Sequence, residues 1–85
     1  MVLYEFYGDG CKHCENMAPK VEKLEEQEDV EVEQLEVWSN QENADKQAEL
    51  DAGKCGGVPF FYNTETDNWI CGEATLKELK EWADV

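Results

Sequence analysis

The pair Cys11 and Cys14, separated by two residues, constrains this chain more than any other feature. They follow an apolar run over residues 2–7 and a Gly8-Asp9-Gly10 turn, and they open a helical pattern. Two thiols at this spacing can close a disulfide across the first turn of a helix. A thiol at a helix N-terminus also faces unpaired N–H groups and the positive end of the helix dipole, which favour the reactive thiolate. The pattern therefore predicts thiol–disulfide exchange.

The pair has two other interpretations, half of a zinc site or a chance coincidence. A structural zinc site usually needs a second close pair of ligands, whereas Cys55 and Cys71 are isolated and far along the chain. The redox interpretation is therefore favoured. Cys11 lies nearer the helix end, so we expect it to be the more exposed, attacking thiol and Cys14 to be the buried, resolving thiol.

Size and charge limit the class of protein. A chain of 85 residues predicts one domain over residues 1–85 with one small core. It begins without a basic region followed by an apolar one, and no run approaches the length of a membrane span. We therefore expect a cytoplasmic protein that does not enter membranes. The formal net charge of −14 repels phosphate backbones, so nucleic acid is not expected as a partner. The acid excess either serves solubility or selects neutral or basic partners.

Apolar periodicity and turn residues predict a βαβ unit, then a helix, a β-hairpin and a final helix. The expected strands are 2–7, 30–37, 58–63 and 69–71. The expected helices run from about 11 to 27, from a capping box at 39–42 to about 51, and from a second capping box at 75–78. The first strand is apolar on both faces except at Glu5, as in a central strand covered on both sides, and the second is expected nearer the sheet edge.

Each expected helix has an apolar face. The core-facing residues are expected to be Cys14, Met17, Ala18, Val21 and Leu24 in the first helix, Ala44, Ala48 and Leu50 in the second, and Leu76, Leu79, Trp82 and Ala83 in the third. Pro19 lies inside the first helix and is expected to kink it.

Lys12 and His13 lie between the two cysteines. A cation at this place stabilises a thiolate, and therefore the reduced form, which makes the disulfide a better oxidant. Alternatively, His13 is a solvent-exposed helix residue with no special role.

Glu5 is an acid in the middle of an otherwise apolar strand. Burial of a carboxyl group is costly unless it has a partner or a function, and burial raises its pKa toward neutrality. Such a group is suited to act as general base or acid for Cys14. The alternative is that Glu5 faces solvent on an edge strand.

Gly57-Val58-Pro59 precedes a strongly apolar strand. A proline at the start of a strand lies where no ladder N–H is needed. The Val58–Pro59 bond is a candidate for the cis isomer, with an ordinary trans bond as the alternative.

Taken together, these residues resemble the thioredoxin superfamily over the whole chain. The resemblance is carried by Glu5-Phe6-Tyr7, Cys11-x-x-Cys14, Met17-Ala18-Pro19, Gly57-Val58-Pro59 and Cys71-Gly72. The short length is similar to that of glutaredoxins and small archaeal thioredoxins. The resemblance implies an α/β fold with a four-stranded mixed sheet of order 2-1-3-4 flanked by three helices. It also implies that Cys11 is the nucleophile, that Pro59 is cis and packs against the disulfide, and that Glu5 takes the place of a buried Asp.

The function implied by the resemblance is that of a protein-disulfide oxidoreductase that needs no cofactor. Its expected partners are disulfide-containing proteins and an electron donor, either a reductase or a low-molecular-weight thiol, and a monomer is the expected state. Substrate contacts are expected from Gly57, Val58, Pro59, Cys71 and Gly72, with the Val58 backbone offered to an extended substrate strand.

The motif also departs from the usual thioredoxin pattern. Gly10 precedes Cys11, and His13 before the second cysteine is more similar to protein disulfide isomerases and periplasmic oxidants. The alternative enzyme is a glutathione-dependent, glutaredoxin-type reductase, whose glutathione loop would be replaced here by Cys71-Gly72-Glu73-Ala74.

Cys55 and Cys71 leave three interpretations open. They are buried small hydrophobic residues, a second redox pair, or extra ligands that join Cys11 and Cys14 around a metal or iron–sulfur centre.

Overall fold

The computed structural model describes residues 2–85 and has the predicted order of elements. The strands are β1 (Leu3–Tyr7), β2 (Val32–Glu36), β3 (Phe60–Asn63) and β4 (Trp69–Cys71), and the helices are α1 (Lys12–Glu28), α2 (Gln41–Asp51) and α3 (Leu76–Trp82). One mixed sheet has the order β2-β1-β3-β4. The predicted fold class is confirmed.

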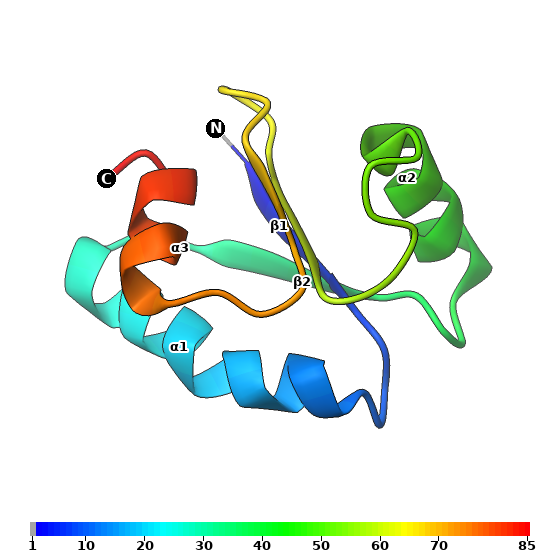
Figure 1. The fold of residues 1–85 in the computed structure, drawn as a ribbon, viewed down its shortest axis with the longest axis horizontal. Coiled ribbons are helices and arrows are strands. Elements are labelled where there is room, and N and C mark those ends of the chain that lie inside the picture. Colours follow the sequence, from blue (N-terminus) through cyan, green and yellow to red (C-terminus); the bar gives the residue numbers. More distant parts are fainter. Residues whose placement is uncertain (1) are drawn as a thin grey trace.

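β1 is the central strand from which the sheet is built. It pairs in parallel with β2, with Leu3 opposite Val32, and antiparallel with β3, with Leu3 opposite Asn63. β4 completes the hairpin with β3. α1 and α3 lie together on one side of the strands and α2 lies on the other (Figure 1). This arrangement explains why β1 is apolar on both faces and β2, at the edge, is not.

The main core lies between the sheet and the α1–α3 layer. Leu3 and Phe61 supply its sheet side, and three buried residues of α1 and two of α3 supply its helical side: Met17, Val21, Leu24, Leu79 and Trp82. The ring of Trp82 meets that of Phe61 edge-on, with 5.4 Å between ring centroids. The spacing of these residues in α1 and α3 is that of a single helical stripe, as predicted.

The predicted helix faces need correction at several positions. Ala18 is exposed, and Leu76 is only partly buried against the core. Ala48 is also exposed, and Ala44 and Leu50 are only half-buried. The buried residues of α2 are polar, Gln47 and Asp51, because α2 binds the loop that follows it and contributes little to the apolar core.

The predicted caps are right for α3 and wrong for α2. At α3, Thr75 and Glu78 form the expected reciprocal capping box. At α2 the N-cap is Asn40, whose side chain accepts from the Asn43 N–H. Ser39 is instead bound to the carboxylate of Glu36 through its backbone N–H and its hydroxyl.

Two further expectations concern α1 and the membrane. Pro19 lies inside α1, which continues as a helix to Glu28, and the kink stays a prediction. Over residues 2–85, no helix combines the length and the apolar character needed to cross a bilayer.

Candidate active site

The turn from β1 to α1 positions the two cysteines. β1 ends at Tyr7, and Gly10 takes a φ of 88°, a left-handed conformation that glycine adopts without a steric penalty. The Cys11 N–H donates to the Gly8 carbonyl at 3.0 Å, which closes the turn. Cys11 then becomes the N-cap of α1 and Cys14 falls in its first turn, with 5.2 Å between their Cα atoms and a disulfide between their sulfurs.

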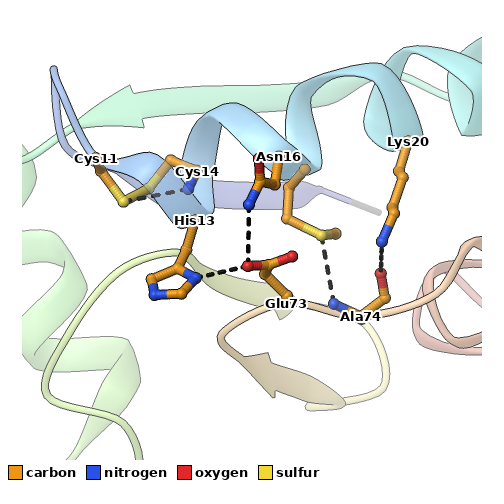
Figure 2. Close-up of polar contacts among 8 residues, drawn as sticks. Cys11, His13, Cys14, Asn16, Lys20, Glu73 and Ala74 are labelled. Atoms are coloured by element: carbon orange, nitrogen blue, oxygen red, sulfur yellow. Dashed lines mark hydrogen bonds and ion pairs between the residues drawn. A yellow bond between two sulfur atoms is a disulfide. The ribbon is translucent and has the colours of Figure 1, made fainter.

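The sulfur of Cys11 lies at the N-terminal end of α1 (Figure 2). Cys11 Sγ accepts from the Cys14 N–H at 3.2 Å. A donor at this place and the helix dipole both stabilise negative charge on the sulfur. The geometry therefore favours a thiolate at Cys11 once the disulfide is opened.

The expectation that Cys11 is the more exposed thiol is wrong for the disulfide state. Both cysteines are 6% exposed. The reason is the N-cap geometry, because the Cys11 side chain folds back over the first turn of α1 instead of extending into solvent.

Glu5 is buried in the central strand, with 1% of its surface exposed. Gln34 lies opposite it on β2, and its Nε2 donates to Glu5 Oε1 at 2.8 Å. Burial raises the pKa of Glu5, the Gln34 hydrogen bond lowers it, and the nearby Glu25 charge raises it, with a net upward shift. The edge-strand alternative is wrong, and Gln34 is a partner that sequence reasoning missed.

A cleft of about 260 Å³ joins Glu5 to the disulfide. Its wall includes Glu5 and Gln34 from the sheet and both cysteines from the start of α1. The carboxyl group and the sulfurs therefore face one space, which has room for solvent between them. A carboxyl group that shares a cleft with two cysteines is a candidate general base or acid for them.

Lys12 and His13 are both exposed, and His13 has a specific partner. His13 Nδ1 lies 2.5 Å from Glu73 Oε2, and the side-chain amide of Asn16 donates to the same oxygen at 3.3 Å (Figure 2). These two contacts, His13 first, lower the pKa of Glu73. His13 is therefore tied to the loop after β4. Its predicted effect on the thiolate stays a prediction.

The loop between β4 and α3 is bound to α1 along several residues. The Lys20 ammonium donates to the Ala74 carbonyl at 3.0 Å, and the Ala74 N–H points at the sulfur of Met17 at 3.3 Å (Figure 2). Glu73 is therefore a residue of the active-site region. No periodicity or motif marks an acid in a short loop, which is why sequence reasoning did not select it.

The predicted substrate residues form a second group beside β3. The Val58–Pro59 bond is cis, as expected, and the trans alternative is wrong. The Gly72 N–H donates to the Pro59 carbonyl at 2.8 Å, and Cys71 lies opposite Phe60 in the hairpin. These residues and Gly57 do not line the cleft at the disulfide. The contact between His13 and Glu73 connects the two groups.

Cys55 and Cys71 form a second disulfide, with 5.4 Å between their Cα atoms. Cys55 is half-buried and Cys71 is exposed, so their interpretation as buried hydrophobic residues is wrong. The four sulfurs are divided between two disulfides instead of being gathered around one centre. Within residues 2–85, no cluster of three or more His, Cys, Asp or Glu side chains has the arrangement of a metal site.

The loop that carries Cys55 is held by Asp51 at the end of α2. The Asp51 carboxylate accepts from the N–H groups of Cys55 at 2.7 Å and Gly56 at 2.8 Å. Burial on its own would raise the pKa of Asp51, but these amides, together with Gln47, hold it below its usual value. The Gln47 side chain also donates to the Gly57 carbonyl at 2.8 Å, so the segment before Pro59 is anchored on both sides.

Comparison with known proteins agrees with this geometry. The family model described as thioredoxin matches residues 1–84. The chain belongs to the thioredoxin family. Members of this family are thiol–disulfide oxidoreductases that act on disulfide substrates with a reductase as partner. The Cys11–Cys14 disulfide has the C-x-x-C spacing of their redox dithiol.

A solved structure shows the same thioredoxin fold. Thioredoxin 1 from the thermophilic eubacterium Thermosipho africanus TCF52B superposes with a TM-score of 0.65 at 18% sequence identity, over 99% of this chain and 91% of that one. A comparison with curated proteins finds no match.

Proposed function

We propose that this thioredoxin-family protein reduces or exchanges disulfides of other proteins through the Cys11–Cys14 pair. One observation carries the proposal. Cys11 Sγ lies at the N-terminus of α1 and accepts a backbone N–H at 3.2 Å, so its surroundings favour the attacking thiolate.

In the proposed first step, the protein is a dithiol and the substrate is a disulfide. The Cys11 thiolate attacks one substrate sulfur, forming a mixed disulfide while the substrate S–S bond breaks. The other substrate sulfur leaves as a thiolate and takes up a proton from solvent. At this stage Cys11 sulfur is oxidised and the leaving substrate sulfur is reduced, by one electron each, and the other substrate sulfur is still bonded to Cys11.

In the second step, Cys14 attacks Cys11 Sγ, and the remaining substrate sulfur leaves as a thiolate that takes up a proton from solvent. Glu5, whose pKa is raised by burial, accepts the Cys14 proton through the shared cleft. The protein then contains the Cys11–Cys14 disulfide, and the substrate has gained two electrons and two protons. A reductase or a low-molecular-weight thiol returns the protein to the dithiol.

Substrate contacts are proposed for the segment around the cis proline. Gly57, Val58 and Pro59 would present backbone groups to an extended substrate chain, with Cys71 and Gly72 at the border of the groove. The half-buried state of Val58 and the anchoring of this segment by Gln47 support a preorganised surface. The cytoplasmic location, the monomeric state and the lack of a cofactor stay predictions.

The test is reduction of insulin disulfides with dithiothreitol as electron source. The protein should accelerate the reaction, and the C11S/C14S variant should fall to the rate of the protein-free control. The matched variant C55S/C71S, which lacks the other disulfide, should keep most of the activity. If the C11S/C14S variant is as active as the parent, the proposal is wrong.

The electron donor can be assigned in the same assay. Glutathione with glutathione reductase, and NADPH with a thioredoxin reductase, are supplied in turn in place of dithiothreitol. Turnover only with glutathione would favour the glutaredoxin-type alternative.

A further inference from the structure

Trp38 is an exposed aromatic residue next to the active site, and the proposed mechanism gives it no role. It lies two residues after the end of β2 and is 60% exposed, more than the exposed Trp69 of β4 at 40%. Its indole lies on Gly8, where an added Cβ would come within 2.2 Å of Trp38 Cδ2. Gly8 in turn accepts the Cys11 N–H and lines the cleft at the disulfide. A single glycine therefore separates the indole from the reactive turn.

Glu36 holds the backbone at Trp38. Its carboxylate accepts from the N–H groups of Asp9 at 2.9 Å, Trp38 at 3.0 Å and Ser39 at 2.9 Å, and from the Ser39 hydroxyl at 2.7 Å. The Ser39 hydroxyl bond comes first among the causes that lower the pKa of Glu36 to about 2, followed by the Asp9 amide. The turn after β2 and the turn before α1 are thus held together, and the exposed ring lies against Gly8, three residues before Cys11.

The cleft lined by Gly8, which the ring contacts, carries acidic residues. Asp9 and Glu15 line the cleft beside Cys11 and Cys14, and the chain as a whole carries a net charge of −14. Lys12, which follows Cys11 in the sequence, carries the opposite charge. An exposed indole face beside carboxylates attracts a cationic side chain, through the ring quadrupole and by charge complementarity.

We infer that Trp38, with Asp9 and Glu15, binds a lysine or arginine side chain that flanks the reactive cysteine of a substrate protein. The inference rests on the proposed disulfide reductase function and names its substrate class. Trp38 and the two acids determine specificity and take no part in the exchange of electrons.

The test compares two disulfide-bonded peptides that differ only in the residue next to one cysteine, Lys in one and Glu in the other. The ratio of their kcat/KM values should favour the Lys peptide at low ionic strength. W38A should lower this ratio about two- to fivefold, as expected for loss of an exposed cation–π contact. The change should come from a lower kcat/KM for the Lys peptide. W38F keeps an aromatic ring and should retain most of the preference. W69A is the matched control and should leave the ratio unchanged.

The charged part of the site is tested by D9N/E15Q and by salt. The double variant should lose preference for the Lys peptide. In 1 M NaCl, where the screening length is about 3 Å, the parent should lose it as well. Equal kcat/KM values for the two peptides in the parent, or an unchanged ratio in W38A, would overturn the inference.

A small neutral disulfide separates this inference from the proposed function. Hydroxyethyl disulfide has no charged side chain, so W38A and the parent should reduce it at equal rates. If the parent reduces neither this disulfide nor insulin, the proposed function fails. If the parent reduces it but does not distinguish the peptides, only the inference about Trp38 fails.

Discussion

The two disulfides of this protein differ in chain separation and in surroundings. Cys11–Cys14 spans three positions, is almost fully buried, and lies at a helix N-terminus beside a cleft with a buried carboxyl group. Cys55–Cys71 spans sixteen positions, joins the loop before the cis proline to β4, and leaves Cys71 exposed. The first has the groups that activate a thiolate around it, whereas the second has a structural carboxylate, Asp51, that holds its loop.

The two disulfides also differ in the stabilisation expected from the length of the loop that each one closes. In the chain-entropy description, closing a loop of about 4 residues stabilises the folded state by about 2 kcal/mol, and a loop of about 17 residues by about 3 kcal/mol. A short loop therefore loses less stability each time it is opened. On this basis we predict that Cys11–Cys14 performs the exchange and that Cys55–Cys71 mainly stabilises the fold, whereas the second redox pair stays the alternative for Cys55 and Cys71.

The largest expected effect comes from Cys11. C11S should reduce the rate of insulin reduction to that of the protein-free control, because serine supplies no thiolate. C55S should retain activity, since Cys55 is not a nucleophile in the proposed mechanism. Mass spectrometry after limiting iodoacetamide on the reduced protein should find Cys11 labelled first. Faster labelling of Cys55 would contradict the division between the two pairs.

The next effect concerns stability. C55S/C71S should lower the free energy of unfolding by about 3 kcal/mol, and C11S/C14S by about 2 kcal/mol. Urea unfolding of both variants and the oxidised parent, followed by tryptophan fluorescence, measures the difference. A larger loss for C11S/C14S would show that the short disulfide is the main staple.

The third prediction concerns Glu5, which should affect both turnover and the pH dependence of stability. E5Q should slow turnover about 10²-fold if Glu5 transfers the Cys14 proton, with Cys11 alkylation little changed. Because burial raises the Glu5 pKa, the folded state binds this proton more tightly than the unfolded state. Glu5 should therefore make the parent less stable as pH rises from about 4.3 through the raised pKa. E5Q should lack this fall, and urea midpoints across that pH range test it.

The smallest expected effect lies in the contact that connects the two regions. E73Q removes a negative charge near the dithiol, so Cys11 of the reduced protein should alkylate faster, by no more than about fivefold for an exposed pair. The difference should disappear in 1 M NaCl. K77Q, a charge change on α3, is the control. A slower reaction in E73Q would mean that the carboxylate acts mainly by holding the His13 side chain in place.

Much of the fold could be predicted because its signals are local. The period of Met17, Val21 and Leu24 defines the buried face of α1, and the Thr75–Glu78 capping box fixes the start of α3. The continuous apolar run of β1 indicates a central strand. Each of these features depends on residues close together in the chain, so a single sequence contains the information needed.

The errors and omissions concern contacts between distant segments. Glu5 was recognised as unusual, but its partner Gln34 is defined by the register of two parallel strands. The contact between Glu73 and His13 spans 60 positions. For Cys55 and Cys71 the sequence leaves three interpretations open, because it does not show which sulfur atoms lie close together. Polar groups in α2 are buried since they bind a loop, which no helical period predicts.

The central position of β1 has a consequence for biosynthesis. The strand that is made first has its antiparallel partner at residues 60–63, with Leu3 opposite Asn63. On a ribosome, β1 must wait for most of the chain before its second edge is covered, and during this interval it exposes unpaired backbone groups and apolar side chains. The parallel partner, β2, is synthesised sooner. We therefore expect the nascent chain to form its first β-α-β unit early and to add the hairpin last.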